Sequence, residues 1–284
     1  MVDTKRVEKL QSIATQVRRD ILRMVYGVQS GHIGGSLGCA DFMTALFFEA
    51  MNCDPANFTM EGQHEDMFFM SNGHITPVLY SVMARRGYFP VSELSTFRRL
   101  HTRLQGHPSC VHGLEGIRMA SGSLGQGVSI ALGAAEAKKM NKDTHLVYVL
   151  TGDGELQEGQ IWEALMYAGA KKVDNLILTV DYNHKQIDGS VEQVMDLLDL
   201  GTKFRSFGWE VIEGEGNDMN TLLICLEKAK QAAGKGKPIA FLMHTEMGFG
   251  IDFMQGSHKW HGTPPNKEQF DAAIAQIPQT LGDF

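Results

Sequence analysis

The sequence predicts an α/β protein in which a mainly parallel sheet lies between two layers of helices. Three apolar runs suit buried strands and lie at residues 146–150, 176–180 and 239–243, and a shorter run lies at residues 209–212. Segments with helical character, residues 158–172 and 218–233, alternate with them. Strands that are apolar on both faces and alternate with helices form parallel sheets covered on both sides. We therefore expect a three-layer α/β/α architecture.

The first third of the sequence predicts helices. From residue 4 to residue 29, apolar residues recur every three or four positions and form one stripe of a long helix, which Ser30-Gly31 ends. Further helices are expected over residues 40–51, 77–87 and 125–140. Neither a repeat nor a Pro/Ser-rich linker divides the sequence. We expect residues 1–284 to form a single domain, with helices or loops before the first strand.

Composition excludes several classes of protein. With 43% hydrophobic residues, the 284-residue chain can bury a core and is not disordered. Its 26 Lys plus Arg and 33 Asp plus Glu give a net charge of −7, without a basic run that would bind nucleic acid. The sequence shows neither an apolar signal core nor the roughly 18 apolar residues of a membrane helix. The four cysteines form no CxxC pair, which indicates neither a zinc site nor a disulfide framework and suits a reducing compartment. Together these observations predict a cytoplasmic protein that binds neither nucleic acid nor membrane.

The motif with the most specific chemistry is GDG at residues 152–154, directly after the first predicted strand. A helix, a second strand and then Asn183 follow. Because the carboxyl ends of parallel strands meet at one edge of a sheet, Asp153 and Asn183 are expected to lie together there. Their oxygens suit Mg²⁺ or Ca²⁺, and Gly154 has no Cβ to keep a phosphate from its N–H. A bare GDG is more often a turn, but this order of elements favours a metal and phosphate site.

The 28 residues between Gly154 and Asn183 are the spacing of the thiamine-diphosphate signature, and the surrounding sequence resembles transketolase. The matching stretches follow in family order over nearly the whole chain: SGHIGGSLG (30–38), SNGHITPVLYS (71–81), LQGHP (104–108), SGSLGQG (121–127), the GDG segment (152–189) and HKWHGTPP (258–265). Transketolases have three domains, and the match is to the first, the diphosphate-binding domain. The resemblance implies the thiamine-diphosphate-binding fold and the N-terminal subunit of a split transketolase.

The resemblance also implies the cofactor, thiamine diphosphate, and a divalent metal. Asp153 and Asn183 correspond to the side-chain ligands of the metal, and Lys185 stands where a backbone carbonyl completes its shell. The residues that correspond to cofactor contacts are His74, Gly122, Ser123, Leu124, Asp153, Gly154, Asn183 and His261.

Four of the eleven histidines lie beside glycine in predicted loops, where functional residues are frequent: His32, His74, His107 and His261. Histidine can donate and accept protons near neutral pH, which carbon–carbon cleavage in a sugar requires. By resemblance, His74 and His261 contact the diphosphate, His32 and His261 the sugar, and His107 the donor's first hydroxyl. Glu158 begins a predicted helix, where its charge is favourable in any case. In the family, the corresponding glutamate joins a proton network between two active sites, so these five residues are the candidate catalytic residues.

The reaction implied by resemblance is transfer of a two-carbon ketol group from a ketose phosphate to an aldose phosphate, as in the pentose phosphate pathway. In the family, the glutamate that activates the aminopyrimidine ring of the cofactor lies in the following domain. We therefore expect the partner to be a separate C-terminal subunit, in an α2β2 assembly, and the substrates to be sugar phosphates.

Other classes of enzyme fit the sequence less well. GGSLG at residues 34–38 matches the GxSxG elbow of hydrolases, but a helix precedes it where a strand is needed. A P-loop motif, GxxxxGK[ST], does not occur in the sequence. Two other thiamine enzymes stay open, a 1-deoxyxylulose-phosphate synthase-like chain and the α chain of a 2-oxoacid dehydrogenase, although the GHP and HGTPP loops favour transketolase. A chain that binds the cofactor but is inactive alone is also left open.

Overall fold

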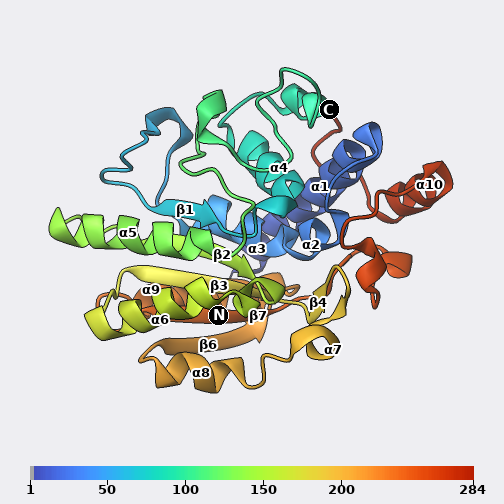
Figure 1. Ribbon diagram of the computed structural model, residues 1–284. Coiled ribbons are helices and arrows are strands. Elements are labelled where there is room, and N and C mark those ends of the chain that lie inside the picture. The colour runs from blue at the N-terminus through green and yellow to red at the C-terminus, as the bar shows by residue number, and fades with distance from the viewer. Residues whose placement is uncertain (1–2) are drawn as a thin grey trace.

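A five-stranded parallel sheet crosses the middle of the computed structural model, which describes residues 3–284 (Figure 1). Its strands are β1 (Met67–Met70), β2 (Val147–Gly152), β3 (Leu176–Tyr182), β6 (Glu210–Glu215) and β7 (Ile239–His244). They lie in the order β1-β2-β3-β7-β6, and each neighbouring pair is parallel. The predicted parallel sheet is therefore confirmed.

Helices cover both faces of the sheet and complete the predicted three layers (Figure 1). One face packs against α1 (Thr4–Val28), α3 (Ala40–Ala45), α4 (Thr76–Arg86) and α9 (Met219–Ala232). The other face packs against α5 (Gln126–Met140), α6 (Gly159–Lys171) and α8 (Leu200–Ser206). The shorter elements are α2 (Ile33–Gly38), α7 (Val191–Met195), α10 (Lys267–Gln276) and a hairpin of β4 (Lys185–Gln186) and β5 (Gly189–Ser190).

Two apolar cores hold the layers together, one on each face of the sheet. Alternate residues of a strand point to opposite faces. In β2, Tyr148 and Leu150 belong to the core under α1 and α9, whereas Val147 and Val149 belong to the core under α5 and α6. All four side chains are at most 1% exposed. Burial on both faces explains why this strand is a continuous apolar run rather than an alternating pattern.

One strand lies where helices or loops were expected. Residues 67–70 (MFFM) form β1, the edge strand beside β2, so the prediction that the first third has no strand was wrong. An apolar run of four residues is too short for its periodicity to distinguish a strand from part of a helix. The strand matters for the site, because it delivers Ser71, Asn72 and His74 to the carboxyl edge of the sheet.

The predicted helices agree with the structure apart from one. Helices α1, α4 and α5 occupy the expected segments, but the segment 40–51 divides into α3 and a π-helical turn at Leu46–Ala50. Within residues 3–284, the structure contains no helix that combines the length and the apolar character of a membrane span.

Candidate active site

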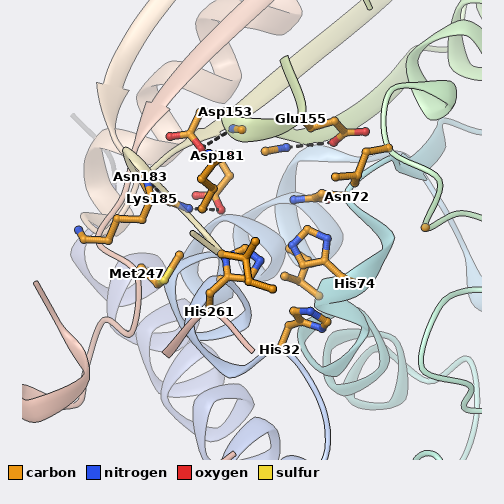
Figure 2. A pocket seen from close by; sticks show the side chains of 18 of the residues that line it. His32, Asn72, His74, Asp153, Glu155, Asp181, Asn183, Lys185, Met247 and His261 are labelled. Atoms are coloured by element: carbon orange, nitrogen blue, oxygen red, sulfur yellow. Dashed lines mark hydrogen bonds between the residues drawn. The ribbon is translucent and has the colours of Figure 1, made fainter. Parts of the chain in front are cut away.

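A cavity of about 300 Å³ opens where the carboxyl ends of β2 and β3 meet the loops after α1 and β1 (Figure 2). This is the edge of the sheet at which parallel α/β proteins bind ligands. Ten of the twelve residues predicted for the site line it: His32, His74, His107, Gly122, Leu124, Asp153, Gly154, Asn183, Lys185 and His261. The structure therefore brings these residues together, while their individual roles stay predictions.

Two predicted residues lie outside the cavity lining. Ser123 is exposed, and its hydroxyl accepts a hydrogen bond from the Gln126 side chain at 3.1 Å. Glu158 is exposed at the N-cap of α6, beside Gly125. Its position agrees with the helix start predicted from sequence, but a role in a proton network would need groups beyond this cavity.

Asp153 is a buried carboxylate that has no cationic partner. It is 1% exposed, and within residues 3–284 no lysine, arginine or histidine side chain forms an ion pair with it. Its Oδ1 accepts the Gly154 N–H at 2.7 Å, and its Oδ2 accepts the His184 N–H at 2.5 Å. Burial, and then the nearby Asp181 carboxylate, raise the pKa of Asp153 to about 8. A buried carboxylate without a countercharge is suited to a bound cation.

Asn183 is held so that its amide oxygen can serve beside Asp153. The Asn183 Nδ2 donates to Asp181 Oδ2 at 2.9 Å, which fixes the orientation of the amide, and its Oδ1 accepts the Lys185 N–H at 2.9 Å. The Lys185 ammonium pairs with Glu246 at 3.2 Å. The groups available to a cation are thus a carboxylate, an amide oxygen and backbone carbonyls, all hard oxygen donors that suit Mg²⁺ or Ca²⁺.

Three imidazole rings meet on the other wall of the cavity, and each comes from a different part of the chain (Figure 2). His32 is the N-cap of α2, His74 follows β1, and His261 lies in the loop before α10. The ring centroids are 4.8 Å apart for His32 and His74, 5.2 Å for His74 and His261, and 5.5 Å for His32 and His261.

The surroundings of these three rings favour the neutral imidazole over the charged one. Burial, with help from the neighbouring imidazoles, lowers the pKa of His32 to about 4 and that of His74 to about 3. Burial and then His258 also lower the pKa of His261. A neutral imidazole can accept a proton on one nitrogen and donate from the other, which is what a site for sugar hydroxyls requires.

Three residues that line the cavity carry buried polar atoms without a partner among the described residues. Within residues 3–284, His32 Nδ1, His261 Nδ1 and the amide oxygen of Asn72 are buried without a hydrogen-bond partner. Each such atom costs about 1–3 kcal/mol when it stays unpaired. The cavity is therefore built to bind a polar molecule.

His107 and Gly122 pack against each other at the mouth of the cavity. Gly122 has φ +131°, and a Cβ at this position would lie 2.6 Å from His107 Cδ2. Glycine is needed here both for its conformation and for this close approach. His107 itself is exposed, and partial burial together with the charge of Arg98 lowers its pKa.

Sequence reasoning missed Glu155, which organises the cavity floor. This carboxylate is 3% exposed and accepts hydrogen bonds from the Ser71 hydroxyl, the Gly125 N–H at 2.9 Å and the Gly152 N–H at 3.2 Å. It thereby ties the end of β1 to the end of β2 and to the start of α5. Burial nevertheless raises its pKa. An acidic residue beside GDG was visible in the sequence, but its three partners were not.

Other lining residues were also missed, namely Asn72, Asp181, Gln186, Ile187 and Met247. The cavity continues into a second hollow of about 570 Å³, with which it shares Ile187 and His261. Of the described residues, those that line this second hollow include His258, Lys259 and Gln269 and no carboxylate. The two hollows therefore adjoin at Ile187 and His261.

Comparison with known proteins supports the resemblance seen in the sequence. The family described as "Transketolase, thiamine diphosphate binding domain" matches residues 10–282. The chain is 39% identical over 269 residues to the 6-deoxy-6-sulfo-D-fructose transketolase subunit SqwG of Clostridium sp. (strain MSTE9), covering 94% of this chain and 96% of that protein. It is 34% identical over 275 residues to one subunit of the apulose-4-phosphate transketolase of Phocaeicola vulgatus, covering 97% and 96%.

Solved structures agree with these matches. Transketolase from Campylobacter jejuni superposes with a TM-score of 0.88 and 34% identity over 96% of this chain and 45% of that chain. Transketolase from Leishmania mexicana gives a TM-score of 0.88 and 30% identity over 96% of this chain and 42% of that chain. The chain thus spans less than half of these transketolases but nearly all of the two similar subunits. The chain belongs to the transketolase family and corresponds to its thiamine diphosphate-binding, N-terminal half.

Proposed function

We propose that this chain is the cofactor-binding half of a two-subunit transketolase, which moves a two-carbon ketol group from a ketose phosphate to an aldose phosphate. One observation carries the proposal: a buried carboxylate without a cationic partner among the described residues and three clustered imidazole rings share one cavity at the carboxyl edge of a parallel sheet. The similar subunits of matching length are named for sulfofructose and for apulose 4-phosphate. We therefore extend the proposal to ketoses that carry any terminal anionic group.

The cavity fits thiamine diphosphate and a divalent cation, Mg²⁺ or Ca²⁺. We assign the cation to the side chains of Asp153 and Asn183 and the carbonyl of Lys185. We assign the diphosphate to His74, to His261, and to the 122–124 loop and Gly154. When bound, thiamine diphosphate supplies the electron sink that allows a carbon–carbon bond beside a carbonyl to break and form.

The chain's own residues position the sugar and move protons. His32 has a buried, unpaired Nδ1 at the cavity wall, so it can hydrogen-bond a sugar hydroxyl. His107 stands at the mouth, where we place the first hydroxyl of the donor. Neutral imidazoles at both places can take a hydroxyl proton and return it. The exposed Glu158 would act only between two copies of the chain, in the α2β2 assembly that we propose with a C-terminal subunit.

A transfer assay tests this function directly. The chain is co-expressed with the product of a neighbouring reading frame that encodes a C-terminal transketolase half, and the complex is supplied with thiamine diphosphate and Mg²⁺. Ketose phosphates, a sulfonated ketose and unphosphorylated ketoses serve as donors, and the shortened aldose product is measured. We expect turnover with the anionic donors. Absence of transfer with every donor would reject the proposal.

Alanine substitutions of His32 and His261 should separate substrate contacts from cofactor contacts. His32→Ala is expected to raise the donor KM about 5- to 150-fold, the equivalent of about 1–3 kcal/mol for one lost hydrogen bond to a bound polar group. Cofactor affinity should stay near wild type in this variant. His261→Ala is expected to lower both the affinity for the cofactor and kcat, since His261 lines both hollows. Steady-state kinetics and calorimetry provide the two readouts.

The exposed His112 supplies the matched control for these histidine variants. His112→Ala should leave both KM and cofactor affinity unchanged. Wild-type kinetics in His32→Ala would show that this ring does not contact the sugar.

A further inference from the structure

One arginine side chain connects the two loops that carry the substrate-side histidines. The Arg98 Nη1 donates to Ser30 Oγ at 2.7 Å, and its Nη2 donates to the Gly106 carbonyl at 3.3 Å. Ser30 lies two residues before His32, and Gly106 lies directly before His107. A single planar guanidinium therefore sets the separation of the two histidine loops.

The backbone is shaped to place this side chain. Arg98 has φ 54°, a left-handed conformation that is uncommon outside glycine, and its N–H donates to the Leu104 carbonyl at 2.9 Å. Its guanidinium lies over the Phe97 ring at 5.6 Å. A Cβ at position 106 would fall 2.7 Å from the guanidinium, so Gly106 leaves room for it. Non-glycine residues hold such conformations only where the surrounding structure enforces them.

The charge of Arg98 is uncompensated. Seventeen ion pairs occur between side chains of residues 3–284, and Arg98 belongs to none of them. Its Nε is buried and has no acceptor among the described residues. Burial is the larger cause of the lowered pKa of His107, and the positive charge of Arg98 is the second. For His32, burial and then His261 lower the pKa most, and Arg98 contributes after them.

We propose that Arg98 is a positioning residue for ketol transfer, which ties the His32 loop to the His107 loop and places a positive charge beside both imidazole rings. A protonated ring could not accept a proton from a sugar hydroxyl, so the charge behind the rings widens the pH range in which they work. The catalytic part of this proposal rests on the proposed function, whereas the coupling of Arg98 to the two rings is a property of this chain.

The loop before His107 has other anchors, so loss of Arg98 should not unfold it. The Thr76 hydroxyl also donates to the Gly106 carbonyl, at 3.0 Å, and the Tyr80 hydroxyl donates to the Gln105 carbonyl at 2.9 Å. Removal of the guanidinium therefore deletes the link to Ser30 and the charge, and leaves the loop attached to α4.

Four variants separate the charge from the link. Arg98→Gln and Arg98→Met remove the charge, Arg98→Lys keeps it, and Ser30→Ala removes only the link to the His32 loop. Arg99→Gln is the matched control, because Arg99 is exposed and adjacent. The other titratable groups that face the two rings are His74 and His261, with His258 and Tyr80 next to them, and all variants retain these.

Ring-nitrogen NMR of the full chain reports the titration of each histidine, with assignments from His32→Gln and His107→Gln. The neutral variants should raise the titration midpoints of His107 and His32, and the lysine variant should not. In the reconstituted enzyme, the acid limb of the kcat/KM profile should move to higher pH in the neutral variants alone. Ser30→Ala should raise the donor KM without moving that limb.

Unchanged midpoints in a folded Arg98→Gln or Arg98→Met protein would overturn the proposal. So would an equal shift in Arg99→Gln, because the effect would then be a general one of surface charge. If the wild-type complex transfers no ketol group, the proposed function fails, but the NMR titration still decides whether Arg98 controls the two rings.

Discussion

Replacement of Asp153 by alanine will abolish the metal-dependent binding of thiamine diphosphate to this chain. Asp153 is the buried carboxylate to which we assign the cation, and Asn183 alone offers no charge to hold one. Loss of residues that merely orient metal ligands costs about 10- to 100-fold in affinity, so loss of the charged ligand should cost at least about 100-fold. Isothermal titration calorimetry with Mg²⁺, near pH 7.5, measures this change.

Two variants show whether the loss comes from the metal or from the fold. Asp153→Asn keeps the shape and an acceptor for the Gly154 N–H while removing the charge. Asp188→Ala removes an exposed carboxylate from the neighbouring hairpin and should bind normally. Chelation of the metal should bring the wild-type protein down to the affinity of Asp153→Ala. Wild-type cofactor affinity in Asp153→Ala would remove this residue from the site.

The dependence of stability on pH provides an independent check of the role of Asp153. The pKa of Asp153 is about 8 in the fold, above its ordinary value of 3.8, because burial and Asp181 disfavour the ionised form. The metal-free fold therefore loses stability as the pH rises between these two values. Asp153→Asn should raise the melting temperature of metal-free protein near pH 7 and abolish its further rise on addition of Mg²⁺ and cofactor. A misfolded variant would lack the higher melting temperature of the metal-free protein.

The layers of the fold could be predicted because burial on both faces leaves a mark in the sequence. Residues 146–150 are apolar without interruption and residues 176–180 are apolar apart from the buried Thr179, as expected of strands between two helical layers. The edge strand β1 was not predicted, because a run of four apolar residues is too short to show a periodicity. The π-helical turn after α3 was not predicted for a different reason. An apolar pattern shows which residues are buried, but it does not distinguish the i to i+4 hydrogen bonds of an α-helix from the i to i+5 bonds of a π-helix.

The site was predictable where its residues lie in short motifs and unpredictable where they meet through tertiary structure. GDG, SGH, GHP and HGTPP each carry their candidate residue with them. Glu155 was missed, since its role comes from Ser71 and Gly125, which lie 84 and 30 residues away. Arg98 was missed likewise, because Ser30 is 68 residues distant and only the folded chain brings the two together.

An apolar segment borders the cavity in this chain. Ile187, which lines both hollows, is 63% exposed, and Val194, Met195 and Leu198 are 46%, 50% and 68% exposed. These residues belong to the β4–β5 hairpin, to α7 and to the loop after it. Such an exposed apolar segment beside a cavity is typical of a surface that a partner covers.

The purified chain should show no detectable ketol transfer, and addition of the C-terminal subunit should restore activity. The partner would both contribute the missing half of the cofactor site and cover the segment 187–198. Leu198→Asp should weaken this complementation, because it places a charge in the covered surface. Met140→Asp is the matched control, because Met140, the last residue of α5, is 82% exposed and lines neither hollow.

We would measure the activity of mixtures in which the concentration of this chain is fixed and that of the partner increases. Sedimentation of the complex then reports how tightly the wild-type and Leu198→Asp chains bind the partner. We expect activity to saturate at a one-to-one ratio of the two subunits, and the complex to have the mass of two copies of each. In such a twofold assembly the exposed Glu158 of one copy can lie close to that of the other, as the proposed proton network requires. Full activity in protein shown to be free of the partner would contradict the two-subunit proposal. Equal loss of complementation in Leu198→Asp and Met140→Asp would instead show that the partner does not bind at the segment beside the cavity.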